Sequence, residues 1–350
     1  MKKYVTGLVV GKFCPLHMGH ISVIQKALDL CENVVILSYT SQSFPGCSAG
    51  NREQWLKQAT AEDSYRVTIA VLDELVVALG LEDDSPADDH RKFCAQYLLN
   101  TLDTTVQAVF TSEDYGQGFA NYLALFFTVN FPNPVNVEHV MVDLDRKVYP
   151  VSGTACRADL KTFGHYVPWY VKKDFVRRVL FLGAESTGKT TLTEALGSPL
   201  TYAKTRNVVP EFGRQLYDER KGILRYEDLA YIGQQQVEME DAYAAAVRID
   251  EFLYCDTSPL TTRFYSQQWY ERVAQSLEAL VWKYANSYYK VFLCAPDFPM
   301  VQDGTRQDET FRNKGHQYYL KELAERGIEY TLLTGSMEQR LEKVKEVLSE

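Results

Sequence analysis

Two histidines stand three positions apart in GKFCPLHMGH, residues 11–20, directly after the apolar run TGLVV. Gly11 lets the chain turn tightly after this run, and Gly19 leaves room for a ligand beside the helix that should follow. Because the free N–H groups and the dipole of a helix start favour anions, phosphate is the expected ligand. His17 and His20 can donate hydrogen bonds to phosphate and stabilise charge on an attacked phosphorus atom. The stretch therefore predicts a phosphate site; two incidental histidines, or half of a metal site, are the alternatives.

A second phosphate-binding pattern, GAESTGKT at residues 183–190, lies between the apolar run RVLFL and the helical run TLTEAL. Backbone N–H groups of such a loop wrap the phosphates of a nucleotide, and Lys189 can reach the β- and γ-phosphates. The Thr190 hydroxyl can ligate magnesium. The pattern therefore predicts a P-loop ATP site. Its expected nucleotide contacts are Gly183, Glu185, Ser186, Thr187, Gly188, Thr190 and Thr191.

Three further segments of the second half favour phosphoryl transfer to an acceptor. Asp256 ends the run FLYCD and can bind magnesium through water or take a proton from a hydroxyl; a helix cap is the alternative. Glu211, the next candidate for the base, and Arg214 are one helical turn apart, so both can face an acceptor or form an ordinary salt bridge. The segment DGTRQDETFR predicts either a lid over the phosphates or a solvated charged helix. Its candidate residues are Asp303, Arg306 and Arg312.

Short β-rich runs alternate with helical patterns along the chain, which is typical of an α/β protein with parallel sheets. The runs TGLVVGKF, NVVILSY, VQAVFTS and VEHVMVD predict a first set of buried strands. The runs RVLFLG, EFLYCDT, KVFLCAPD and EYTLLTG predict a second set. Pro168, aromatic residues and a basic run interrupt the pattern between the sets. We therefore expect one domain at residues 1–170 and another at residues 171–350.

Composition limits the class of protein. A length of 350 residues with 46% hydrophobic residues suits two globular domains. The net charge of −9 argues against a broad face for nucleic acid or membrane. No export signal is visible, no apolar run reaches the roughly 20 residues of a membrane helix, and the seven cysteines form no CxxC pair. We expect a soluble cytoplasmic protein with reduced thiols and small-molecule partners, which could be a homo-oligomer.

GKFCPLHMGH resembles the GxFxPxHxGH signature of the nucleotidyltransferase superfamily, which transfers AMP from ATP to small phosphate compounds. VSGTACR, residues 151–157, resembles the second signature of that superfamily, although a plain helix cap also explains it. The resemblance implies a Rossmann-like domain in which a substrate phosphate attacks the α-phosphorus of ATP and pyrophosphate leaves. It implies His17, His20 and Arg157 as catalytic residues. The implied ATP contacts are Gly11, Lys12, Phe13, Gly19, Ser152 and Thr154, of which Lys12 could equally be a solvated lysine.

The order of the two motifs resembles the NadR-type bifunctional enzymes of NAD metabolism. The resemblance covers nearly the whole chain, including SEDYG, DRKVYPVSGTACR, PEFGRQLYDE and DTSPLTT. In that family a nicotinamide-mononucleotide (NMN) adenylyltransferase domain precedes a P-loop ribosylnicotinamide kinase domain. The resemblance therefore implies nicotinamide riboside, NMN and ATP as substrates, with Mg²⁺ held through ATP by Thr190 and Asp256. With the motifs described above, we expect Lys189, Asp256 and Glu211 to be the catalytic residues of the kinase.

Several alternatives stay open at this point. The same fold could act on another nucleoside or nucleotide, or could sense nucleotides with one inactive domain. A flavin-type bifunctional enzyme is excluded, because its kinase half has no Walker motif. Some NadR-type proteins carry an N-terminal repressor domain; this sequence starts at the catalytic strand, so we expect no transcriptional role. Tyr115, Tyr217 and Trp169 could stack on a pyridine ring, with Arg214 beside the substrate, although core packing explains the aromatic residues equally well.

Overall fold

The computed structural model describes residues 2–198, 206–285, 287–300 and 307–349. The chain divides into two compact units, Met1–Phe175 and Val176–Glu350. The boundary expected after residue 170 falls within the short helix α8 (Trp169–Lys172). Each unit contains one five-stranded sheet in which all paired strands are parallel. The prediction of an α/β fold with two parallel sheets is confirmed.

The sheet of the first unit has the strand order β3-β2-β1-β4-β5. Successive connections run outward from β1 to β3 on one side and from β4 to β5 on the other, so the order reverses between β1 and β4. Ligands of open parallel sheets bind at the carboxyl ends of the strands at such a reversal. The strands are β1 (Tyr4–Gly11), β2 (Cys31–Ser38), β3 (Val67–Val71), β4 (Ala108–Thr111) and β5 (Glu138–Met141).

Both faces of this sheet are covered along its central strands. Successive side chains of a strand point to opposite faces, and Leu8 and Val9 of β1 belong to two different buried clusters. The helices of the unit are α1 (Met18–Leu30), α2 (Ala49–Ala59), α3 (Asp73–Ala78), α4 (Ala87–Asn100), α5 (Gly116–Asn130), α6 (Gly153–Ala158), α7 (Leu160–Phe163) and α8. Three 3₁₀ turns accompany them: η1 (Ala61–Arg66), η2 (Gly164–Tyr166) and η3 (Lys173–Phe175).

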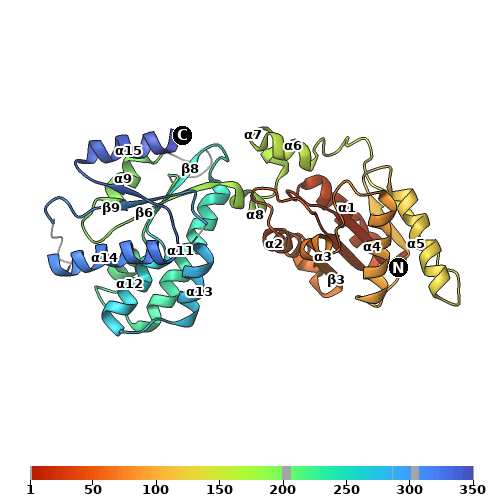
Figure 1. Ribbon diagram of the computed structural model, residues 1–350, viewed down its shortest axis with the longest axis horizontal. Helices are drawn as coiled ribbons and strands as arrows, with labels where there is room; N and C mark the ends of the chain where they lie inside the picture. The colour runs from red at the N-terminus through yellow and green to blue at the C-terminus, as the bar shows by residue number, and fades with distance from the viewer. Residues whose placement is uncertain (1, 199–205, 286, 301–306, 350) are drawn as a thin grey trace. The chain divides into compact units, whose positions relative to one another are not determined.

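The sheet of the second unit has the order β10-β9-β6-β8-β7, with the P-loop strand β6 at its centre. Helices lie on both sides of this sheet (Figure 1). The strands are β6 (Arg177–Leu182), β7 (Val208–Val209), β8 (Phe252–Asp256), β9 (Lys290–Cys294) and β10 (Thr331–Leu333). The helices are α9 (Lys189–Leu196), α10 (Phe212–Glu219), α11 (Tyr226–Ala246), α12 (Pro259–Tyr270), α13 (Gln275–Tyr284), α14 (Glu309–Glu325) and α15 (Met337–Ser349).

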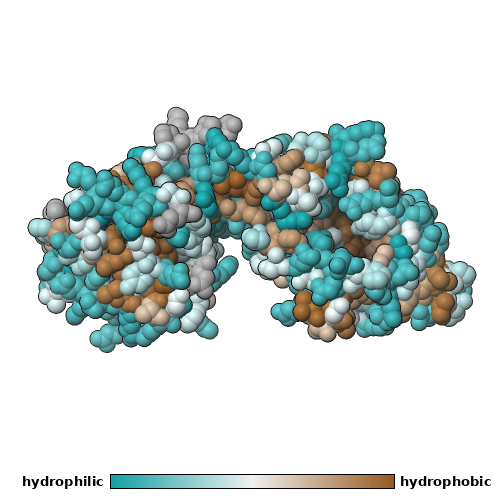
Figure 2. Space-filling model, turned by 45° about the horizontal axis from the view of Figure 1, so that its top comes forward, coloured by the Kyte–Doolittle hydropathy of each residue, from teal (hydrophilic) through white to brown (hydrophobic). Residues whose placement is uncertain are grey.

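Two further features of the units are the hydropathy of their surface and the state of their cysteines. Figure 2 shows hydrophilic side chains over most of the visible surface of the two units. Among the described residues, no helix combines the length and apolar character that a membrane span requires. All seven cysteines are buried and free.

Candidate active sites

The HxGH turn of the first unit joins β1 to α1 at the carboxyl edge of the sheet. His17 is the N-cap residue of α1, and its ring stacks on the ring of His20 with 3.7 Å between centroids. A Cβ atom at Gly19 would come within 3.1 Å of the His17 ring. A side chain at Gly19 would therefore crowd this ring, which explains the glycine. Phe13 packs against Gly11 and is buried beneath the turn.

The two imidazoles are neutral at neutral pH. Burial, assisted by the positive charge of Arg146, lowers the pKa of His17 to about 4. Burial and the neighbouring His17 lower the pKa of His20 well below its ordinary value. Both ring nitrogens of His17 and Nδ1 of His20 are buried without a hydrogen-bond partner. Buried polar atoms of this kind are usually satisfied, so a ligand with hydrogen-bonding oxygens is the expected occupant.

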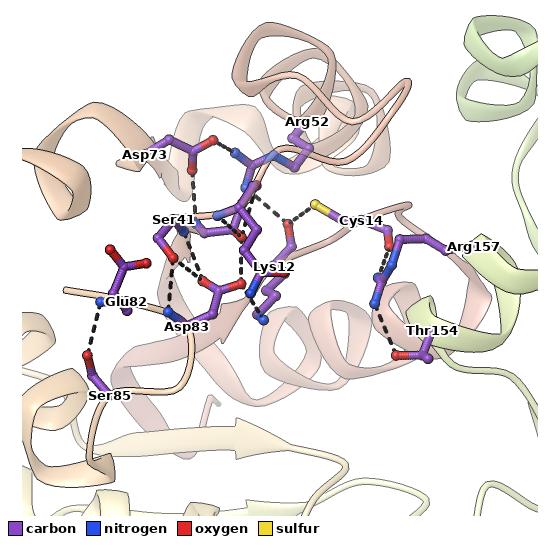
Figure 3. A network of polar contacts seen from close by, with 12 residues as sticks. Lys12, Cys14, Ser41, Arg52, Asp73, Glu82, Asp83, Ser85, Thr154 and Arg157 are labelled. Carbon is purple, nitrogen blue, oxygen red and sulfur yellow. Dashed lines mark hydrogen bonds and ion pairs between the residues drawn. The ribbon is translucent and has the colours of Figure 1, made fainter. Parts of the chain in front are cut away.

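The segment VSGTACR, residues 151–157, contacts the turn formed by GKFCPLHMGH, residues 11–20. Arg157 Nη1 donates to the carbonyl oxygen of Cys14 over 2.5 Å, and Arg157 Nη2 donates to Thr154 Oγ1 over 3.1 Å (Figure 3). Ser152 is the N-cap residue of α6, and its hydroxyl accepts from the Ala155 N–H over 3.0 Å. The helix-cap explanation of this serine therefore holds in the structure. The triphosphate contacts expected of Ser152, Thr154 and Arg157 stay predictions.

One cavity of about 700 Å³ brings these groups together. That volume lies within the range of small-molecule sites. Its lining includes the following residues that the sequence predicts for the first unit: Gly11, Lys12, Phe13, His17, Gly19, His20, Tyr115, Ser152, Thr154 and Arg157. The lining also contains Tyr39, Asp83, His90 and Arg146, which the sequence analysis missed. Trp169 is not among the lining residues and is 59% exposed.

The P-loop of the second unit connects β6 to α9. Gly183 and Gly188 have φ values of +153° and +82°, a conformation that favours glycine. Lys189 Nζ donates to the carbonyl oxygens of Gly183 and Ala184 over 2.8 and 2.9 Å. The Lys189 side chain therefore lies along the loop, and Lys189 is itself the first residue of α9. This arrangement presents N–H groups and one ammonium group to an anion.

Three oxygen-bearing side chains surround the end of this loop. The Thr190 hydroxyl donates to Asp256 Oδ2, whereas Asp256 Oδ1 is buried without a hydrogen-bond partner. Burial raises the pKa of Asp256, opposed by the positive charge of Lys189. Burial and the Asp256 carboxylate together raise the pKa of Glu211. Ser258, and not Asp256, caps the following helix α12, so the helix-cap alternative for Asp256 is wrong.

A cavity of about 520 Å³ adjoins this loop. Aromatic side chains form part of its lining, and among them Tyr265 and Trp269 were missed by the sequence analysis. Tyr265 donates through its hydroxyl to Glu185 Oε1 over 2.9 Å, which ties α12 to the loop. The predicted residues that line the cavity are Gly183, Glu185, Ser186, Thr187, Gly188, Lys189, Thr190, Thr191, Glu211, Arg214 and Tyr217.

Two buried arginines contact the P-loop from α14 and α15. Arg312 is 1% exposed and donates to the carbonyl oxygen of Ser186 over 3.1 Å. Arg340 is fully buried and donates to the carbonyl oxygen of Thr187 over 3.0 Å. Arg312 is therefore engaged with the loop backbone and is not among the residues that line the cavity. The other two residues predicted for the lid, Asp303 and Arg306, lie outside the described residues.

In the part of the chain that the structure describes, no group of three or more His, Cys, Asp or Glu side chains is arranged to hold a metal ion. The Thr190 hydroxyl and the unpartnered Asp256 Oδ1 are nevertheless oxygen ligands of the kind that magnesium prefers. They fit a magnesium ion that arrives with a nucleotide.

Comparisons with known proteins agree with this two-site organisation. Residues 8–158 match the cytidylyltransferase-like family and residues 178–340 match the AAA domain family. The trifunctional NAD biosynthesis/regulator protein NadR of Salmonella typhimurium (strain LT2) is 27% identical over 369 residues, covering 98% of this chain and 83% of that protein. The protein of the same name from Escherichia coli (strain K12) is 25% identical over 351 residues, covering 94% of this chain and 78% of that protein.

Two solved structures have the same fold over the whole chain. A NadR protein in complex with NR superposes with a TM-score of 0.60 at 19% identity, covering 99% of this chain and 97% of that chain. A NadR protein in complex with NAD and AMP-PNP gives the same TM-score and identity, with coverage of 100% and 96%. The chain is therefore similar to NadR proteins over nearly its whole length, with a region similar to cytidylyltransferases followed by a region similar to AAA domains.

Proposed function

We propose that this chain makes NAD from nicotinamide riboside in two ATP-dependent steps. The second unit transfers the γ-phosphoryl group of ATP to the riboside and forms NMN. The first unit transfers AMP from ATP to NMN and forms NAD with release of pyrophosphate. One observation carries the proposal: each unit gathers the residues of its own phosphate motif around its own cavity, in a chain similar to NAD biosynthesis proteins over 98% of its length.

Adenylyl transfer in the first unit needs no protein nucleophile. The phosphate of NMN is already ionised at neutral pH and attacks the α-phosphorus, while pyrophosphate leaves with its electron pair. His17 and His20 are neutral and have nitrogens without partners, so they act as hydrogen-bond donors toward the α-phosphate. Lys12 and Arg157 line the same cavity and supply positive charge toward the triphosphate. Catalysis then comes from positioning and electrostatics.

Phosphoryl transfer in the second unit uses the P-loop and the nearby carboxylates. Lys189 and the loop N–H groups hold the β- and γ-phosphates. A magnesium ion would be held by Thr190 and Asp256, and it neutralises charge between these phosphates when bound. Glu211 lines the acceptor cavity and has a raised pKa, which suits a group that takes the proton of the 5′-hydroxyl. Arg214 and Tyr217 line the same cavity, where they would contact the riboside.

The test is an assay of the purified protein with ATP and Mg²⁺, with products separated by chromatography. Nicotinamide riboside should give NMN and then NAD, and NMN alone should give NAD and pyrophosphate. Parallel reactions with nicotinate riboside and its mononucleotide measure the preference for the amide or the acid. Turnover of another nucleoside in place of both ribosides would refute the substrate assignment, and ATP binding without any product would make the chain a nucleotide sensor.

A further inference from the structure

The carboxylate of Asp83 is held in one position by residues that follow β2. Its Oδ1 accepts hydrogen bonds from the Ser41 N–H over 2.9 Å and from the Ser41 hydroxyl over 3.3 Å. Its Oδ2 accepts from the Thr40 hydroxyl over 2.8 Å. The Asp83 N–H donates in turn to the Ser41 hydroxyl over 3.0 Å. With only 6% of its side chain exposed, this carboxylate cannot turn away without breaking several contacts.

The ammonium group of Lys12 contacts the Asp83 carboxylate. Its Nζ donates to Asp83 Oδ2 over 2.6 Å, although the two residues are 71 positions apart (Figure 3). The Lys12 carbonyl oxygen is held as well, because it accepts from Arg52 Nη1 over 3.1 Å and from Ser38 Oγ over 3.2 Å. Arg52 is fixed in its turn by an ion pair with Asp73. Although 45% of the Lys12 side chain is exposed, its carbonyl oxygen and its ammonium group are both held by contacts, which restricts its rotamers.

The surroundings of Asp83 favour its ionised form. Burial alone would raise the pKa of Asp83, but hydrogen bonds from Lys12, Ser41 and Thr40 outweigh it and lower the pKa. The carboxylate is therefore ionised at neutral pH. An ammonium group has three N–H donors, and the contact with Asp83 uses one of them. The others remain for phosphate oxygens in the cavity, which both Lys12 and Asp83 line.

We propose that Asp83 is a positioning residue for adenylyl transfer, which holds the Lys12 ammonium at the wall of the cavity in advance of ATP. The proposal rests on the activity proposed for the first unit. Because the cation is already ordered, binding of the triphosphate does not have to restrict its side chain. The sequence analysis assigned no role to Asp83, which lies in the loop before α4.

The decisive variant is Asp83→Asn, assayed with NMN and ATP in a Lys189→Ala background that removes the second ATP site. The amide oxygen of asparagine can still accept from Thr40 or Ser41, but the charge on Lys12 loses its partner. We expect the KM for ATP to rise about tenfold, with kcat changed less than about twofold. Asp84→Asn, at the exposed neighbouring carboxylate, is the matched control and should leave both constants unchanged.

A double-mutant cycle separates positioning from a purely structural role. If Asp83 acts through Lys12, adding Asp83→Asn to a Lys12→Met variant should change the KM for ATP by less than about twofold. An equal effect of the asparagine in both backgrounds would overturn the proposal. A fall in KM would also overturn it, because Asp83 would then compete with ATP for the lysine.

Two further measurements keep the result interpretable. Asp83→Glu keeps the negative charge and should recover most of the affinity for ATP; a glutamate variant as weak as the asparagine variant contradicts the proposal. Calorimetric titration of ATP in the Lys189→Ala background gives the same comparison without turnover. If the wild-type protein binds ATP in its first unit but forms no NAD, the proposed function fails while the titration still decides the role of Asp83.

Discussion

Replacing His20 by alanine should slow NAD formation from NMN by about 10²- to 10³-fold and leave riboside phosphorylation at its wild-type rate. The His20 ring is enclosed between His17, at 3.7 Å between centroids, and Phe13, at 5.0 Å. Its Nδ1 is buried without a partner, so it is preorganised for a ligand. Loss of one such preorganised donor typically costs about 2.7–4 kcal/mol of transition-state stabilisation, which gives the expected factor.

Two matched variants separate the hydrogen bond from the packing. His20→Phe keeps an aromatic ring against His17 but has no ring nitrogen, so it should be about as slow as the alanine variant. His165→Ala removes an exposed histidine of the same unit and should keep the wild-type rate. The assay is the initial rate of NAD formation, with riboside phosphorylation measured on the same preparation as the control for protein concentration and thermal unfolding as the control for folding of the first unit. A normal rate in His20→Ala, or recovery in His20→Phe, would refute the donor role.

Three more predictions concern the two ATP sites. Lys189→Ala should abolish riboside phosphorylation and leave NAD formation from NMN unchanged; a parallel loss of both rates in a folded protein would contradict the two-site proposal. Asp256→Asn should keep most of the calorimetric affinity for ATP, which the loop supplies, and lose turnover; retained turnover removes Asp256 from the reaction. The third prediction concerns pH, because burial lowers the pKa of His17 to about 4. The free energy of unfolding should decrease as the pH falls below about 6.5, since the unfolded histidine then binds a proton that the folded one excludes until about pH 4. Chemical denaturation at several pH values, compared with His17→Phe, tests the sign.

The two phosphate-binding loops could be predicted from the sequence because each is one short continuous stretch. Their conformations are set locally, by Gly188 with φ +82° in one loop and by Gly19 against the His17 ring in the other. The strand after which each loop comes was also visible as an apolar run. Since parallel strands place their carboxyl ends at one edge of a sheet, the position of both sites followed from the strands.

The residues that support these loops could not be predicted, because they come from distant parts of the chain. Asp83 contacts Lys12 across 71 positions, and Arg340 contacts the Thr187 carbonyl across 153. Their local sequences, LEDDSP and MEQRLE, are typical of a solvated loop and a charged helix. Arg312 was predicted to face the phosphates, whereas its guanidinium contacts the backbone of the loop. Periodicity within one segment carries no information about which remote carbonyl or ammonium group that segment will meet.

The two candidate sites belong to different units and, among the described residues, have no lining residue in common. Each unit also has its own sheet and its own buried clusters. A substitution in one site should therefore act on one rate directly, and the other rate reports whether the other unit is intact. The proposed product of the second unit is, however, the proposed acceptor of the first. A kinase variant will lack NAD formation from the riboside and retain it from NMN, so only reactions started with NMN distinguish a defect of adenylyl transfer from a lack of substrate.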